Sequence, residues 1–281
     1  MGVRRPCIHP PGGPLRPGPL QSMSAPRLLA GASGFAYKPW KGPFYPAGLK
    51  DAEMLGYYAR QLPTVEINNT FYRMPKRSVL EGWARQVPAG FRFVLKASRR
   101  ITHLARLKDC AEPLGFLLTN VPALGDRLGP LLFQLPPNLK PDAGRLEAFL
   151  TLLDESQPTT LCRAAFEFRH PGWFDESIYE LLRAHDAALV LADHGEQEEA
   201  TPFVATGPFG YLRLRRDAYT DTDLAAWARR VAAQPWDEAY VFFKHEDAGL
   251  APKLALRLLE IYGRIPGQNG LSFSCGESLY C

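Results

Sequence analysis

The sequence lacks any long apolar run. None of its hydrophobic stretches reaches the roughly 18 residues that a membrane-spanning helix requires, and the N-terminus has no apolar stretch of signal-peptide length. Yet 46% of the 281 residues are hydrophobic, which is enough to bury a large core. We therefore expect a soluble cytoplasmic protein with no membrane partner, and we exclude disorder as its main state.

Cysteines are few and follow no pattern. The five cysteines form no CxxC pair, and their odd number does not suit a disulfide framework. They are Cys7, Cys110, Cys162, Cys275 and Cys281. A zinc ribbon and a disulfide-rich secreted domain are both unsupported, and we expect reduced thiols.

Short catalytic signatures are missing as well. No GxGxxG or GxxxxGK[ST] loop follows any apolar run, which argues against an open nucleotide-binding sheet. The sequence contains no GxSxG nucleophile motif and no HxH or HxxxH pair. Any chemistry must therefore come from residues that are dispersed along the chain.

The excess of positive charge is small. The formal net charge is +4, but residues 1–26 contain three arginines and no acidic residue, which leaves 30 basic against 29 acidic residues elsewhere. A folded body this balanced gives no global field for non-specific binding to a phosphate backbone. We expect any preference for anions to be local, and we keep nucleic acid only as an alternative partner.

Both ends of the chain lack a pattern that could be buried. Residues 1–26 contain seven prolines and four glycines, a composition that cannot offset the entropy of ordering. We predict a disordered tail over 1–26, a folded domain over 27–265 and a loose tail over 266–281. Met23 begins a segment that reads like a natural start, so we expect residues 1–22 to be dispensable.

Short apolar runs alternate with amphipathic stretches between these tails. The strand candidates are 28–33, 64–70, 91–98, 129–136, 163–169, 187–193, 209–215 and 238–245. Helical patterns lie at 52–61, 78–87, 110–118, 143–153, 177–184, 222–232 and 252–262, but the stretch after the sixth strand lacks one. Candidate helix caps are Ser78, Asp175 and Thr222. This alternation predicts an α/β fold, a single (β/α)₈ TIM-type barrel, for which about 250 residues is typical.

Nearly every predicted strand ends in a polar residue, and in each strand the alternating pattern turns that residue to the same face as in the others. Barrel strands send alternate residues inward, and barrel sites form at the carboxyl ends of strands. Alternation turns these residues inward at that end: Ser33, Glu66, Asn68, Lys96, Gln134, Glu167, Arg169, Asp193, Arg213, Arg215 and Lys244. Burying so many polar groups is costly unless they serve a ligand, so they indicate a site; structural ion pairs among them are the alternative.

The three acids and five bases of this set favour an anionic small-molecule ligand. We predict that Glu167 is the general acid/base, with Glu66 and Asp193 as its partners and Lys96 as a charge stabiliser. Arg169 and Arg213 would form an anion clamp. Loop aromatics offer stacking surfaces, although Trp173 is expected to be packing. The predicted ligand-binding residues are Tyr37, Trp40, Asn68, Tyr72, Gln134, Arg169, His170, Arg213 and Lys244.

Other reactions and cofactors stay open. The three acids with His170, His194 and His245 would offer ligands to a divalent metal, but the neighbouring lysines and arginine would repel it, so we assign no metal ligands. Lys96 or Lys244 is a candidate Schiff-base lysine. The rival functions are a nucleic-acid-binding or repair-type phosphodiesterase and a non-catalytic ligand-binding barrel.

Several ordered segments carry a family resemblance. SGFAYKPWKGPFYP, VEINNTFYRMP, FRFVLKAS, LGPLLFQLPP, FEFRHPGWF, LVLAD and YLRLR together resemble the YecE-like family of unknown function, domain of unknown function 72. The resemblance covers about residues 28–262 and implies a (β/α)₈ barrel of a bacterial cytoplasmic protein without an established reaction. It also implies a shape similar to apurinic endonucleases and sugar isomerases, which often use metal ions. The eighth strand ends in FFKHED where many relatives are asparagine-rich, so roles transfer least to Lys244 and His245.

Overall fold

The computed structural model describes residues 25–156, 162–193, 201–244 and 248–265. Eight parallel strands close into a barrel in chain order, and β1 pairs with both β2 and β8. The strands are β1 (Arg27–Ala32), β2 (Thr64–Ile67), β3 (Arg92–Lys96), β4 (Leu128–Gln134), β5 (Ala164–Glu167), β6 (Ala188–Asp193), β7 (Phe209–Leu214) and β8 (Glu238–Phe243). The predicted (β/α)₈ TIM-type barrel is confirmed, while the predictions for residues 1–24 and 266–281 lie outside the described residues.

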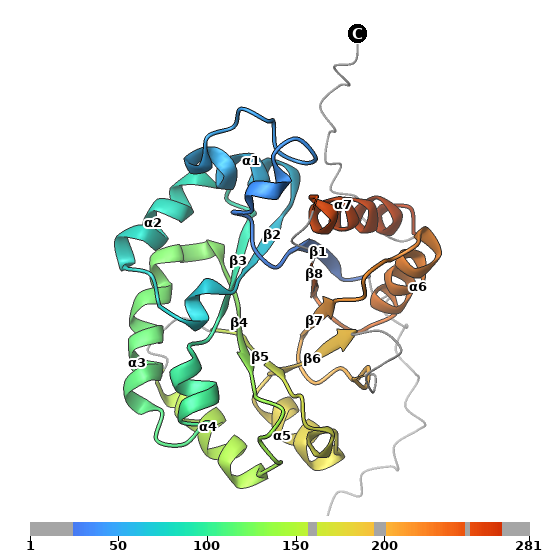
Figure 1. Cartoon of the computed structure of the whole chain (residues 1–281). Coiled ribbons are helices and arrows are strands. Elements are labelled where there is room, and N and C mark those ends of the chain that lie inside the picture. The colour runs from blue at the N-terminus through green and yellow to red at the C-terminus, as the bar shows by residue number, and fades with distance from the viewer. Residues whose placement is uncertain (1–24, 157–161, 194–200, 245–247, 266–281) are drawn as a thin grey trace, which may run out of the picture.

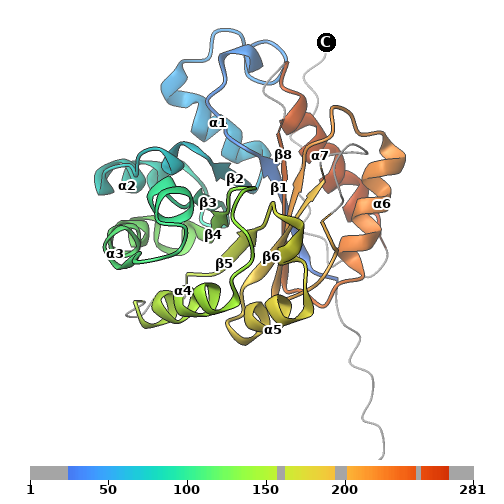
Figure 2. The same cartoon turned by 60° about the horizontal axis from the view of Figure 1, so that its bottom comes forward.

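Helices surround the barrel (Figure 1, Figure 2). They are α1 (Met54–Gln61), α2 (Arg77–Gln86), α3 (Ala111–Asn120), α4 (Ala143–Glu155), α5 (Glu176–Ala184), α6 (Asp221–Ala232) and α7 (Leu250–Gly263). In both views α2 and α3 lie on one side of the barrel and α6 and α7 on the other. The described residues between β6 and β7, 201–208, form no helix, as the sequence pattern indicated.

Three helix starts illustrate the local chemistry. The Asp175 side chain accepts a hydrogen bond from the Ser177 amide and caps α5, as predicted. A capping box of Thr220 and Asp223 starts α6, so Thr222, the predicted cap, already lies inside the helix. No side chain caps α2, which begins one residue before Ser78, and that prediction is therefore wrong as well.

The two faces of each strand pack into separate apolar layers. The barrel interior is filled by Leu29, Val94, Leu132, Ala165, Ala188, Val190, Phe209, Tyr211, Tyr240 and Phe242. Residues of opposite parity, such as Val65, Phe93 and Leu191, belong to the outer core under the helices. This alternation confirms the predicted inward face for every strand except β6.

The amino-terminal end of the barrel is closed by paired charges. Arg163 donates to Glu238 over 2.9 Å and to the Tyr240 hydroxyl over 2.6 Å, and Arg27 reaches Glu238 from the neighbouring strand. The amino-terminal face of a TIM barrel contributes to stability rather than to a site, and these paired charges are typical of it. The carboxyl end is consequently the face on which to look for a site.

Candidate functional site

A cavity of about 460 Å³ opens at the carboxyl end of the barrel. We call it the mouth cavity; its lining residues are Ser33, Tyr37, Asn68, Asn69, Phe71, Tyr72, Lys96, Gln134, Arg169, Arg213, Arg215 and Lys244. They come from the ends of β1, β2, β3, β4, β5, β7 and β8 and from the loops that follow. Most of the predicted site residues therefore meet in one place, as barrel topology requires.

A buried ion network forms the floor of the mouth cavity. Arg213 bridges two fully buried carboxylates, with Nη2 2.6 Å from Glu66 Oε1 and Nη1 in contact with Glu167 Oε2. The Tyr211 hydroxyl donates to Glu66 Oε2 over 2.6 Å from the layer below. The side-chain Nδ2 of Asn68 donates to Glu66 Oε1 over 2.9 Å. Every buried charge in this floor has partners, as a stable buried ion network needs.

The network continues toward β3 through a neutral side chain. Gln134 donates from Nε2 to Glu167 Oε1 over 2.7 Å, and its Oε1 accepts from Lys96 Nζ over 2.6 Å. Arg169 Nε lies 3.2 Å from Glu167 Oε1 at the edge of the cavity. Side chains from β3, β4, β5 and β7 are thus held in one connected set of hydrogen bonds.

Charge in this network keeps both carboxyls ionised. Burial alone would raise the pKa of Glu66, but the Arg213 and Arg215 guanidiniums outweigh it and lower that pKa to about 2. The pKa of Glu167 is lowered well below its usual range in the same way, with Arg169 contributing. A carboxylate that stays ionised has no proton to give, so the geometry does not suit the predicted use of Glu167 as a general acid.

Arg213 itself is a structural bridge. Its side chain is only 2% exposed, and both terminal nitrogens are taken by carboxylates. This pairing fits the alternative of a structural ion pair and argues against the predicted anion clamp, although Arg213 still lines the cavity. Alternation specifies the direction of a side chain but not its depth, so the sequence placed Arg213 inward without deciding between a ligand and a carboxylate as its partner.

Arg215, two residues further along the chain, is the donor that the list of predicted binding residues omitted. Its side chain lines the cavity, and its Nε is buried without a hydrogen-bond partner. Burial and the Arg213 charge lower the pKa of Arg215, and the Glu167 and Glu66 carboxylates offset only part of this effect. The alternating pattern of YLRLR, which turns Arg215 inward, was the signal that could have found it.

Lys96 lines the cavity with an ammonium group whose pKa is lowered toward neutrality. Burial lowers the pKa of its ammonium to about 8, and the Arg213 charge acts in the same direction. The Lys96 Nζ lies 4.2 Å from the centre of the Phe71 ring, which fixes its position. Burial also lowers the pKa of nearby His103, together with the Lys96 and Arg169 charges.

Positive charge dominates the cavity wall. Five cationic side chains line it, namely Lys96, Arg169, Arg213, Arg215 and Lys244, and the described lining contains no Asp or Glu. The two carboxylates below supply two negative charges against these five. Besides Arg215 Nε, the buried Ser33 Oγ and Arg213 Nε of the same lining also have no hydrogen-bond partner among the described residues. Such a wall is suited to an anion.

Three predicted site residues lie elsewhere. Asp193 faces the helices, where Arg216 and Tyr219 bind its carboxylate, because Ala188 and Val190 are the inward residues of β6. The prediction that it joins the other two acids is wrong. Trp40 is fully buried against Tyr37, Phe44 and Tyr45 and presents no face to a ligand.

His170 serves its own loop. Its Nδ1 accepts from the Gly172 amide at the start of the short helical turn Pro171–Trp173, on the parity that points away from the cavity. Trp173 is fully buried and stacks on Phe168 with a centroid distance of 4.7 Å, so the expectation of packing there is confirmed. His170 and Trp173 therefore support the barrel, while Arg169 is the residue of this loop that lines the mouth cavity.

A metal site has little support in this geometry. Among the described residues no group of three or more His, Cys, Asp or Glu side chains is close enough to hold a metal ion. Arg213 occupies the space between Glu66 and Glu167, where a cation would have to lie. His194 and His245, which belonged to the predicted alternative of a metal site, lie outside the described residues.

Two further expectations concern cysteines and the membrane. Cys110 and Cys162 are buried free thiols. Among the described helices, none has the length and apolar character needed to cross a membrane.

Fold and site together define a (β/α)₈ barrel with a cation-lined cavity at its carboxyl-terminal mouth. The chain belongs to the DUF72 family, described as proteins of unknown function, whose model matches residues 29–270. It is 36% identical over 150 residues to the UPF0759 protein YecE of Escherichia coli K12, covering 52% of this chain and 54% of that protein. The UPF0759 protein YunF of Bacillus subtilis is 28% identical over 142 residues, 48% of this chain and 49% of that protein. The matched stretch thus spans about half the length of these curated relatives.

Solved structures of the same family share the fold. A DUF72 family protein from Thermotoga maritima superposes with a TM-score of 0.73 and 28% identity, covering 84% of this chain and 98% of that one. Another from Enterococcus faecalis gives a TM-score of 0.68 at 20% identity, covering 84% and 95%. The resemblance expected from the sequence is confirmed, and neither comparison names a ligand or a reaction.

Proposed function

We propose that the protein is an enzyme that binds a small phosphorylated molecule in the mouth cavity and uses Lys96 as a general acid. The observation that carries the proposal is Arg215, a desolvated guanidinium that faces the cavity and has no carboxylate partner among the described residues. A buried cation that lacks a direct ion pair is costly even with Glu66 and Glu167 nearby, and an anionic ligand would reduce that cost.

Phosphate suits this wall better than a carboxylate does. Arg169 and Arg215 approach the cavity from β5 and β7, while Lys244 comes from β8, so donors surround a ligand from three sides. Guanidinium forks match the spacing of phosphate oxygens, and several donors can share a charge of nearly two. Tyr37 and Tyr72 in the same wall offer ring faces to the remainder of the molecule.

Lys96 is the cavity group best suited to proton transfer. Glu66 and Glu167 stay ionised, whereas Lys96 is protonated below about pH 8 and held by Gln134 and Phe71. A group with a pKa close to the working pH donates and regains its proton most readily. We therefore propose that Lys96, rather than Glu167, donates the proton to the oxyanion that develops on the substrate.

A panel of phosphorylated metabolites tests this function. A ligand at about 100 times its Kd stabilises a protein by about 2.7 kcal/mol, which is about 5 to 10 °C in melting temperature for a domain of this size. We expect some compounds to reach that shift and at least one of them to be converted.

The pH profile identifies the acid. With Lys96 as the acid, kcat is constant at low pH and falls above about pH 8, since the ammonium is then lost. The Lys96→Met variant should bind the compound but convert it at least about 100-fold more slowly. Stabilisation without conversion by the wild type would instead make the protein a non-catalytic binding barrel. The absence of any stabilising compound would contradict the anion site itself.

A further inference from the structure

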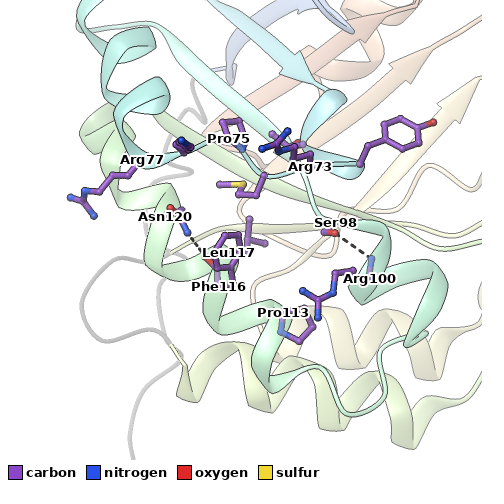
Figure 3. Close-up of a pocket in the computed structure, with 13 residues that line it drawn as sticks. Arg73, Pro75, Arg77, Ser98, Arg100, Pro113, Phe116, Leu117 and Asn120 are labelled. Carbon is purple, nitrogen blue, oxygen red and sulfur yellow. Dashed lines mark hydrogen bonds between the residues drawn. The ribbon is translucent and has the colours of Figure 1, made fainter.

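A second cavity of about 540 Å³ adjoins the mouth cavity. It lies between the segment that leads into α2 and the outer face of α3; Figure 3 shows Arg73, Pro75 and Arg77 on one side, Phe116 and Leu117 on the other, and Ser98 and Arg100 at one end. We call it the α2–α3 groove. Its volume is within the range of small-ligand sites, and none of the described residues that line it is acidic.

The groove and the mouth cavity are built from the same two chain segments. Tyr72 lines both of them. At the end of β3, Lys96 faces the mouth cavity and Ser98 lines the groove, and residues two apart in an extended chain are separated by at most about 7 Å. Thr70 fixes the junction, because its hydroxyl bonds to the carbonyl oxygens of Ile67 and Lys96. One ligand of modest length would therefore reach both cavities.

The groove combines apolar surface with cations that have no partner. Phe116 is 54% exposed although it is a large aromatic side chain, and Tyr72 is 72% exposed. Arg77 and Arg100 are paired with Glu81 and Glu112. Arg73 and Lys76, by contrast, form no side-chain hydrogen bond or ion pair within the described part of the chain. Exposed rings beside unpaired cations suit a planar group that carries a phosphate.

We propose that the α2–α3 groove is a second subsite, which binds the distal nucleotide of a phosphorylated dinucleotide whose terminal phosphate occupies the mouth cavity. The inference rests on the proposed function, since the mouth cavity supplies the first phosphate site. Arg73 and Lys76 bind the phosphodiester that joins the two nucleotides, and Tyr72 and Phe116 contact the bases. A flexible acidic peptide would use the cations but leave the ring faces without a matching planar group.

Isothermal titration with AMP and with the 5′-phosphorylated dinucleotide pApA tests the proposal. We expect the wild type to bind pApA at least about tenfold more tightly than AMP, since each charged hydrogen bond contributes about 1.5 to 3 kcal/mol, or about 10- to 100-fold. In Arg73→Ala/Lys76→Ala the affinity for pApA should fall to that for AMP, while the affinity for AMP stays unchanged. Ribo and deoxyribo forms of pApA distinguish an RNA-type from a DNA-type ligand.

A matched variant controls for lost charge. Arg229→Ala/Lys253→Ala also removes two exposed cations, from α6 and α7 on the opposite side of the barrel, and should bind both probes like the wild type (Figure 1). Phe116→Ser, at an exposed position, should weaken pApA alone. Equal affinities of the wild type for pApA and AMP, or an acidic peptide that binds the groove instead, would overturn the proposal.

The two proposals fail differently. Arg215→Ala should weaken both AMP and pApA, because both place a phosphate in the mouth cavity. If AMP binding depends on Arg215 but pApA gains nothing over AMP, the groove inference is wrong and the mouth site stands. If pApA binding depends on Arg73 and Lys76 but neither probe responds to Arg215, the proposed function is wrong while the groove remains a nucleotide site.

Discussion

Arg213 lies on β7 and Arg215 directly follows the end of that strand; both line the mouth cavity, yet they have different surroundings. Two residues along a strand advance about 6.6 Å, which moves a side chain from one layer of the barrel interior to the next. Arg213 lies in the layer of Glu66 and Glu167, whereas Arg215 lies above it in the cavity wall. Depth in the barrel therefore separates Arg213, which bridges two carboxylates, from Arg215, which we propose binds the anion.

This difference predicts losses of stability of different size. Arg213→Ala leaves two buried carboxylates without their counter-charge and should lower the free energy of unfolding by about 3 to 5 kcal/mol. Arg215→Ala removes a charge that Arg213 repels and that attracts Glu66 and Glu167 without a direct ion pair, so these effects partly cancel and the loss should stay below about 1 kcal/mol. Urea unfolding at neutral pH measures both. An Arg213→Ala variant as stable as Arg215→Ala would contradict the bridge.

The sequence predicted the direction of a side chain correctly in some strands and incorrectly in β6, because the strands differ in their alternation of polar and apolar residues. In β2, β5 and β7 a polar residue alternates with apolar ones, so the parity of Glu66, Glu167 and Arg213 was readable. β6 is apolar on both faces, and its last residue, Asp193, gave no such indication. In β6 the small side chains of Ala188 and Val190 fill the barrel interior. Leu189 and Leu191 face the helices. Such an error in the direction of one side chain leaves the predicted fold unchanged but removes a residue from the predicted site.

At the scale of elements, the barrel was predictable because each strand is bounded by turn residues or by an amphipathic helix. Predicted strands overran the observed ends, as at 64–70 against Thr64–Ile67, since polar residues at a strand end continue the same alternation into the loop. Those overruns coincide with the site. Asn68, Asn69 and Phe71 lie just past β2 and line the mouth cavity.

Closure of the barrel depends on close contact between β1 and β2. A side chain on Gly31 would place its Cβ 2.1 Å from the Thr64 carbonyl oxygen, a backbone atom that cannot move without displacing the neighbouring strand. We expect Gly31→Ala to cost about 1 to 3 kcal/mol of unfolding free energy. The control is Gly48→Ala, which meets nothing within 4 Å. Thermal unfolding compares the two, and equal melting temperatures would show that β1 can shift.

At the scale of the whole molecule, charge is arranged unequally between the two ends of the barrel. At the amino-terminal end two arginines, Arg27 and Arg163, share the Glu238 carboxylate and leave an excess of one positive charge. At the carboxyl-terminal end five cationic side chains share two buried carboxylates. Since the chain outside residues 1–26 is nearly balanced, this local excess is what distinguishes the mouth cavity from the rest of the surface.

Sulfate titration by calorimetry tests whether the mouth cavity is an anion site centred on Arg215. Sulfate stays fully ionised near neutral and mildly alkaline pH, so only the protein titrates. The wild type should bind one sulfate per chain, and the affinity should fall as salt rises. Arg215→Ala should bind it at least about tenfold more weakly, whereas Arg229→Ala, on α6, should match the wild type. Equal sulfate affinities of the wild type and Arg215→Ala would contradict the account.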